Sequence, residues 1–225
     1  MTIEPIAYIH TEFAQKFGVP RQSGLAGSLR GTIVFVPEYR NADALRGLDG
    51  FSHIWLIWGF SANDNAGGWQ PTVRPPRLGG NERMGVFATR SPFRPNPLGL
   101  SCVEVDHIES DTSQGPVIHV KGADLLDGTP IYDIKPYVKY ADARPHALCG
   151  YVDLLKERTL KVVLPEELAA KVADKSSLNS LVEVLRLDPR PSYHDDSKRV
   201  YGLSFRGMNV RFNVISGTLT VVSID

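Results

Sequence analysis

Short apolar runs alternate with polar turns through the first 140 residues of the chain. Several of these runs are rich in β-branched and aromatic residues and are bounded by Gly, Pro, Asn or Asp, as is typical of strands. They lie at residues 6–9, 33–36, 51–60, 98–108, 117–120 and 131–137. No helical crossover is predicted between them, so the pattern favours a mainly β fold with an antiparallel sheet closed into a β-barrel.

The last third of the chain predicts helices as well as strands. Pro165 followed by two glutamates is a favourable helix start, and apolar residues then recur at helical spacing. Residues 209–224 alternate around Ser216-Gly217, which is typical of a hairpin. We therefore expect a β-barrel domain over residues 1–145 and a small α+β domain over residues 146–225.

Residues 80–101 form the stretch around which the rest of the chain is organised. Residues 84–89 are predicted to form a short strand, and Pro92, Pro95 and Pro97 make the next segment irregular and stiff. A strand pattern resumes at Leu98. The prediction is a rigid loop between two elements, where binding groups tend to lie.

Charge is balanced over the whole chain but not locally. The 25 Lys and Arg equal the 25 Asp and Glu among 225 residues, whereas residues 74–94 hold five arginines against Glu82, a local excess of four. Arg74 and Arg77 flank two prolines, and this loop either contacts RNA phosphates or is simply solvated. Trp69, after two glycines, is expected near the surface, where it could stack on a base.

Several classes of protein are disfavoured by what the sequence lacks. It has neither the P-loop nor the dinucleotide-binding pattern, and no GxSxG elbow. The two cysteines lack CxxC spacing, so we expect no metal site and no disulfide framework. The apolar runs are too short to cross a bilayer and the start is not a secretory signal, which together predict a cytoplasmic protein without a membrane partner.

Two motifs could carry chemistry or be structural. His53 lies in the most apolar stretch, so it is either a core histidine with one satisfied ring nitrogen or a functional group. Asp124 and Asp127 bracket two leucines ahead of a turn. Their carboxylates are either turn residues or acceptors for a ligand amine or ribose.

Residues 83–101, RMGVFATRSPFRPNPLGLS, resemble the signature of the tRNA methyltransferase O family, also called the TsaA-like family. Further segments resemble the same family in the same order, at residues 16–22, 50–55, 68–81, 124–130 and 133–137. Residues 188–193 resemble the C-terminal extension of its bacterial branch. The resemblance covers most of residues 5–140.

The resemblance implies an S-adenosylmethionine-dependent methyltransferase on a β-barrel. Its members are homodimers that methylate the exocyclic nitrogen of threonylcarbamoyladenosine, 3′ of the anticodon in tRNA. The cofactor contacts it implies here are Thr11, Glu12, Phe13, Ser52, His53, Arg90, Arg94, Asp124, Leu125, Leu126 and Asp127. Residues 10–13 depart from the family's Arg-Ser-Pro-aromatic pattern, which is harmless if these contacts are made by the backbone.

A physical mechanism consistent with this resemblance assigns roles to individual residues. His53 and Arg90 are the expected catalytic residues, and Lys135, Arg74, Arg77 and Trp69 are the expected RNA contacts. Positioning alone can supply ~7–11 kcal/mol. The proton acceptor is His53 or the substrate's own carboxylate, and Arg90 or Arg94 would hold that carboxylate by a bidentate contact.

Two other functions remain open from the sequence. The barrel could bind RNA or a nucleotide without catalysis, or it could methylate a small carboxylated molecule. Binding of S-adenosylmethionine separates the first from an enzyme, and the identity of the methylated product separates the second.

Overall fold

The computed structural model of the chain describes residues 2–61, 68–79, 81–155, 159–191, 196 and 198–225. Six strands form a closed barrel in the order β1-β2-β7-β6-β3-β8, with every neighbouring pair antiparallel. Their bounds are β1 Ala7–Thr11, β2 Arg30–Phe35, β3 His53–Gly59, β6 Leu98–Glu109, β7 Val117–Lys121 and β8 Thr129–Pro136. The predicted antiparallel β-barrel is confirmed.

Alternation of side chains fills the barrel. On β3, Ile54 and Leu56 are fully buried, and they pair with Val103 and Ser101 of β6, which are also buried. The residues between them face outward, as the two-residue period of a strand requires. The most apolar run of the sequence thus becomes the strand between β6 and β8.

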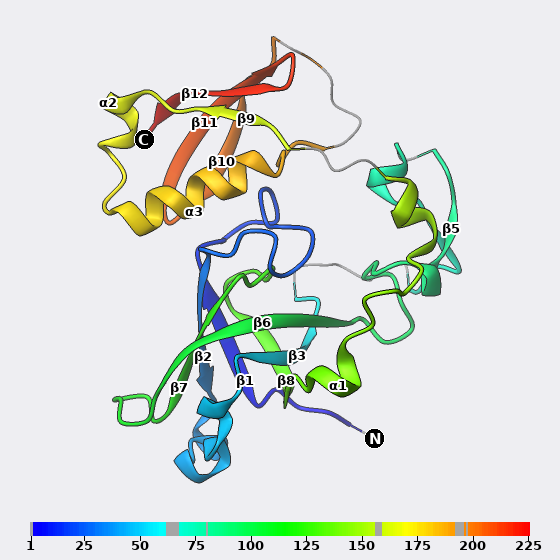
Figure 1. Cartoon of the computed structure of the whole chain (residues 1–225), viewed down its shortest axis with the longest axis vertical. Coiled ribbons are helices and arrows are strands. Elements are labelled where there is room, and N and C mark those ends of the chain that lie inside the picture. Colours follow the sequence, from blue (N-terminus) through cyan, green and yellow to red (C-terminus); the bar gives the residue numbers. More distant parts are fainter. Residues whose placement is uncertain (1, 62–67, 80, 156–158, 192–195, 197) are drawn as a thin grey trace.

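The C-terminal part is a four-stranded sheet with two helices (Figure 1). Its strands run in the order β10-β11-β12-β9, and β9 lies parallel to β12. The bounds are β9 Lys161–Val163, α2 Glu166–Ala169, α3 Lys175–Arg186, β10 Tyr201–Phe205, β11 Met208–Ile215 and β12 Thr218–Ile224. Both predicted helical regions and the terminal hairpin are confirmed, while β9 and β10 were not predicted.

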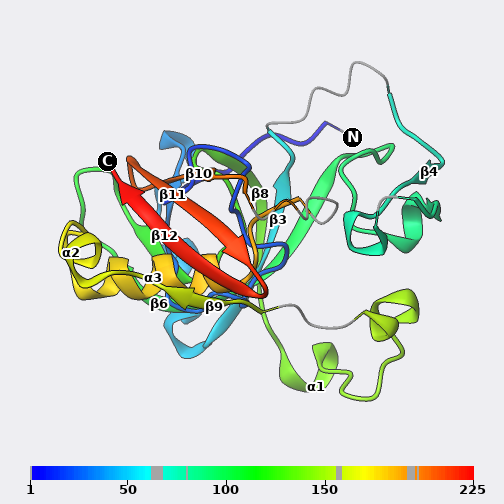
Figure 2. The same ribbon diagram turned by 90° about the horizontal axis from the view of Figure 1, so that it is seen from above.

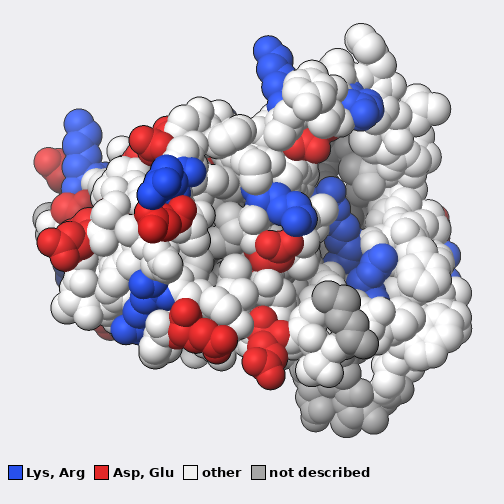
Figure 3. All heavy atoms as spheres, turned by 90° about the horizontal axis from the view of Figure 1, so that it is seen from below, with Lys and Arg blue, Asp and Glu red and all other residues white. Residues whose placement is uncertain are grey.

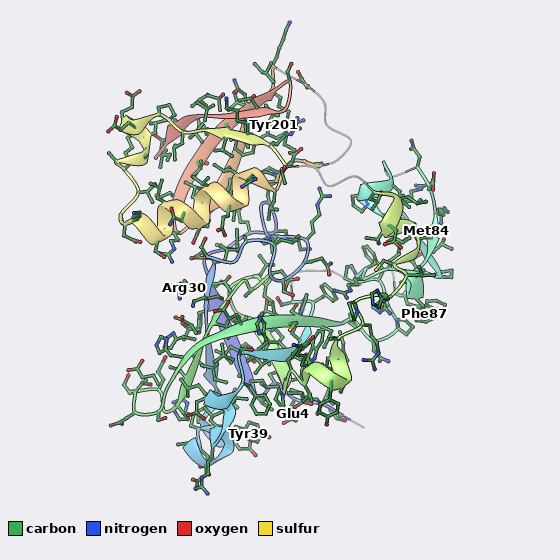
Figure 4. The ribbon with its side chains drawn as sticks, in the orientation of Figure 1. Glu4, Arg30, Tyr39, Met84, Phe87 and Tyr201 are labelled. Atoms are coloured by element: carbon green, nitrogen blue, oxygen red, sulfur yellow. The ribbon has the colours of Figure 1, made fainter. Side chains whose placement is uncertain are left out.

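An arm extends from the barrel between β3 and β6. It comprises residues 68–79 and 81–97 and contains β4 Thr72–Val73, η4 Pro76–Leu78, β5 Met84–Gly85 and η5 Val86–Ala88. Figure 4 shows Met84 and Phe87 out on this arm. The strand predicted over residues 84–89 is wrong beyond Gly85, because buried Val86 starts a 3-10 turn that Thr89 closes through its N–H.

A second excursion follows β8, through α1 Lys139–Asp142 and η6 Gly150–Leu154. Seen from above, it leaves the barrel on the same side as the arm, but the two stay apart (Figure 2). The remaining short turns, η1 Pro37–Tyr39, η2 Ala42–Leu45 and η3 Leu48–Gly50, cover the opposite end of the barrel. Within the described residues, no helix has the length and apolar character needed to span a bilayer.

The barrel and the C-terminal part share a hydrophobic core. Phe13, Ala26 and Leu29 from the first 30 residues are buried in the same cluster as the C-terminal side chains. Phe13 meets Phe205 edge to face, with ring centroids 5.9 Å apart. Residues on both sides of the predicted boundary at 145/146 therefore build one core, and the boundary itself stays a prediction.

Gly99 on β6 provides a test of the barrel packing. A Cβ at Gly99 would overlap the indole of Trp58, its cross-strand neighbour on β3. Because overpacking costs about 1–3 kcal/mol, Gly99→Ala should lower the free energy of unfolding by that amount in urea titrations.

Gly85→Ala is the matched control. A Cβ there meets open space and the residue has φ −56°, so this substitution should be neutral or stabilise by up to about 1 kcal/mol. Equal effects of the two substitutions would show that the close approach at Gly99 does not limit the packing.

Candidate functional site

Thr11 and Asp127 form one side of the candidate site. Thr11 ends β1, and its N–H donates to Asp127 Oδ1 at 3.1 Å, while its hydroxyl donates to the carbonyl of Leu125 at 3.0 Å. His10 Nδ1 lies 3.1 Å from the same Asp127 oxygen. The segment 124–128 is fixed to β1 by these contacts, which bring together two of the segments that the sequence predicted.

Asp124 lies at the end of a hydrogen-bonded chain inside the barrel. Ser101 Oγ donates to Asp124 Oδ1 at 2.6 Å and accepts from Trp58 Nε1 at 3.0 Å. Burial raises the pKa of the Asp124 carboxyl, and the Ser101 hydroxyl and the charge of Arg90 act in the opposite direction. The result is a fixed, poorly hydrated carboxyl beside a cation, an environment common at functional sites.

Arg90 and Arg94 have different surroundings, although the sequence predicted the same role for both. Arg90 is exposed and donates to Gln22 Oε1 from the loop after β1. Arg94 is half-buried and donates to the carbonyls of Val86 at 3.1 Å and Thr89 at 2.7 Å. Arg94 thus closes the arm on itself, and its guanidinium lies over the Phe87 ring, whereas Arg90 faces the Asp124 side.

Ser52 and His53 lie on the other face of the barrel wall. His53 Nδ1 is 2.9 Å from Ser52 Oγ, and its ring lies beside Tyr137. His53 pairs with Glu104, one residue out of phase with the inward Ile54 and Val103, so it points outward. Asp124 bonds to inward-facing Ser101, so one chain places the side chains of His53 and Asp124 on opposite sides of the same two strands.

Four of the predicted cofactor residues have side chains engaged elsewhere. The Glu12 carboxylate is 5% exposed and binds Arg206, and Phe13 and Leu125 are each 1% exposed in hydrophobic clusters. Leu126 packs partly buried against the C-terminal core. The main-chain carbonyls of these four residues also accept hydrogen bonds within the chain. Cofactor contacts by the backbone of residues 11–13 therefore stay a prediction.

The predicted RNA contacts are spread over two surfaces. Trp69 is 51% exposed and Arg74 is exposed, both on the arm. Arg77 lies in η4, and its side chain is outside the described part of the chain. Lys135 lies on the outer barrel wall, next to Trp55, and pairs with Asp133 at 2.9 Å. Figure 3 shows Lys and Arg gathered around a hollow on the arm side of the molecule.

A cavity of about 370 Å³ opens beside the start of β6. Its walls are Gly59, Phe60, Asn96, Leu98 and Tyr132, together with Ile3, Ser61, Pro97 and Pro130. None of the predicted site residues contributes to it. The candidate site residues are therefore separate from this cavity.

Comparison with known proteins identifies the lineage. Residues 8–143 match the tRNA-methyltransferase O N-terminal domain and residues 157–225 match the TrmO C-terminal domain. The chain belongs to the tRNA methyltransferase O family. It is similar to the tRNA (adenine(37)-N6)-methyltransferase of Escherichia coli K12, at 39% identity over 99% of this chain and 97% of that protein.

A sequence and a solved structure from Pseudomonas aeruginosa extend the comparison. The sequence, whose name describes an S-adenosylmethionine-dependent methyltransferase, is 38% identical over 94% of this chain and 92% of its own length. The crystal structure of TrmO superposes with a TM-score of 0.80, at 31% identity, covering 100% of this chain and 98% of that one. The match therefore extends over both the barrel and the C-terminal sheet.

Sequence reasoning missed three contributors to the site. Gln22 holds Arg90, Ser101 holds Asp124, and Arg206 holds Glu12. Ser101 gave a usable signal, since it is a hydroxyl in phase with the inward-facing residues of a strand. Nothing local marked Arg206, because its partner lies 194 residues away.

The two arginines should separate in stability measurements. Arg94→Ala removes charged hydrogen bonds to two loop carbonyls and should lower the free energy of unfolding by about 1.5–3 kcal/mol. Arg90→Ala changes an exposed side chain and should remain within about 0.5 kcal/mol of the parent. Urea denaturation, with limited proteolysis of the arm, measures both, and equal losses would contradict the different roles.

Proposed function

We propose that the protein transfers a methyl group from S-adenosylmethionine to the exocyclic nitrogen of the adenine at tRNA position 37, in its threonylcarbamoyl form. The observation that carries this proposal is the full-length similarity to the E. coli tRNA (adenine(37)-N6)-methyltransferase. The local geometry fits it, because a carboxyl cluster and an arginine meet at one end of the barrel.

The residues present fit the polar groups of S-adenosylmethionine. Ribose hydroxyls and an ammonium group require acceptors, which Asp124 and Asp127 supply, and backbone groups of residues 11–13 and 125–126 flank them. The cofactor, when bound, supplies a methyl group on a sulfonium. The chain's task is to orient the cofactor and to present the acceptor nitrogen in line with that methyl group.

Charge on the chain supports the handling of the acceptor. Arg90 is exposed beside the Asp124 cluster, where its guanidinium can hold the threonyl carboxylate of the modified base. Proton removal from the acceptor nitrogen is assigned to His53 or to that carboxylate. The hydrogen bond between Ser52 and His53 fixes the ring of His53 for such a role.

Opposite placement of His53 and Asp124 supports a homodimer. One cofactor cannot touch both faces of the β3–β6 wall within one chain, whereas a second copy can bring its outer wall to the first copy's Asp124 cluster. Exposed apolar side chains occur on the outer wall and the second excursion, at Leu100 (50% exposed), Tyr140 (90%) and Leu148 (94%). Such groups are typical of surfaces covered by a partner.

Labelled methyl transfer is the direct test of the reaction. Total tRNA from a strain lacking the protein should gain label from S-adenosylmethionine in threonylcarbamoyladenosine alone after digestion to nucleosides. A protein that binds the cofactor but labels only a small metabolite would be the small-molecule enzyme. A protein that does not bind the cofactor at millimolar concentration would not be a methyltransferase.

Mixing two inactive variants tests the shared site. His53→Ala and Arg90→Ala should each abolish most activity, and co-expression should restore about a quarter of the parent activity. With equal expression, half of the dimers contain one copy of each variant. In these dimers one of the two shared sites has both His53 and Arg90, so a quarter of all sites are intact. No recovery, with dimers shown by light scattering, would place both residues in the same chain's site.

Arg74 tests the RNA footprint. Arg74→Glu should weaken tRNA binding and reduce the slope of log affinity against log salt by about 1, because one phosphate contact is lost. Cofactor affinity should not change. Filter binding between 50 and 200 mM salt measures the slope, and an unchanged slope would remove this part of the arm from the footprint.

A further inference from the structure

The hairpin between β10 and β11 reaches across to the end of β1. Arg206 lies at its turn, and its Nε and Nη2 donate to Glu12 Oε1 at 3.1 and 2.6 Å. Its main-chain N–H donates to the Glu12 carbonyl at 3.2 Å. One residue of the C-terminal part therefore holds both the side chain and the backbone of Glu12.

The turn conformation is unusual for a long side chain. Arg206 has φ +48° and the following Gly207 has φ +77°, the combination that a tight two-residue hairpin turn requires. Glycine or asparagine adopts it more easily than arginine does. The guanidinium also donates to Ser177 Oγ near the start of α3, so the strained residue has partners in both parts of the molecule.

Glu12 connects the contact with Arg206 to the candidate site. It stands between Thr11, whose N–H and hydroxyl bind Asp127 and Leu125, and Phe13, whose carbonyl accepts from the Asp127 N–H at 2.9 Å. The second Glu12 oxygen accepts from the Arg30 N–H at 3.3 Å, and Figure 4 places Arg30 where the barrel faces the C-terminal part. Movement of Glu12 would therefore shift its two neighbours, Thr11 and Phe13, which both form hydrogen bonds with Asp127.

We propose that Arg206 is a positioning residue for the cofactor site, holding residues 11–13 in the conformation that fixes Asp127. The inference rests on the proposed function only in taking S-adenosylmethionine as the ligand. It assigns the C-terminal part a role in cofactor binding through a named contact. A second tie supports it: Ser28 donates its N–H to Glu183 of α3 and accepts from Ser180 at its carbonyl.

The test compares four full-length variants without and with S-adenosylmethionine. Arg206→Ala removes the contact, Arg206→Lys keeps the charge without the planar fork, and Glu12→Gln removes the partner's charge with little change of shape. Arg211→Ala, exposed on the adjacent strand β11, is the matched control. Calorimetry measures cofactor affinity, and hydrogen exchange of the unliganded protein measures protection of the Thr11, Phe13 and Asp127 amides.

Arg206→Ala and Glu12→Gln should bind S-adenosylmethionine more than tenfold more weakly and exchange those three amides faster. Arg206→Lys should recover part of the affinity, Arg211→Ala should match the parent, and the KM for the cofactor should rise more than kcat falls. If Arg206→Ala does not fold, Glu12→Gln carries the test.

Affinity within twofold of the parent in both variants, with unchanged amide protection and a lower melting temperature, would make the contact merely structural and overturn the inference. A parent protein that fails to bind the cofactor would instead overturn the proposed function. The exchange measurements, made without ligand, would still decide whether Arg206 holds residues 11–13.

Discussion

The ion pair between the buried Glu12 carboxylate and the partly exposed Arg206 guanidinium is the interaction on which the arrangement of the candidate site depends. A carboxylate that is 5% exposed is stable only if its charge and lone pairs are satisfied. Burial raises the pKa of Glu12, and hydrogen bonding to Arg206 opposes that rise. Because Glu12 lies between two residues that bind the segment 124–127, satisfying this carboxylate also fixes the cluster around Asp127.

The barrel supplies rigidity and the loops supply chemistry. Every strand has two neighbours, so no edge is left to shift in register, and segments 11–13, 22–30 and 124–128 emerge from it at one end. The same closure separates the two faces of β3 and β6. A wall one strand thick holds Ser101 and Asp124 inside and His53 outside.

Local sequence patterns were enough to predict the fold. Residues 51–60 and 98–108 are apolar runs with the composition of strands. The terminal hairpin contains its own turn sequence, Ser216-Gly217. Strand β9 was missed because three residues give too little pattern and its partner β12 lies more than 50 residues away along the chain. Strand β10, by contrast, pairs with β11 across the two-residue turn at Arg206-Gly207 and was not predicted. The strand predicted over residues 84–89 ends at Gly85. Val86 is of a residue type that favours strands, but here it is buried at the start of a 3-10 turn.

The sequence named the residue types and segments of the candidate site but not the orientation of their side chains. Asp124, Asp127, Arg90 and Thr11 do lie in connected segments, whereas the contact of Arg94 with two arm carbonyls depends on how the arm folds back. The outward direction of His53 was implicit in the strand period, since Ile54 and Leu56 had to face the core. Pairings such as Ser101 with Asp124 require the register of two strands and a loop together. Such contacts arise only when the barrel closes. The sequence segments therefore predicted which residues take part but not which residues they contact.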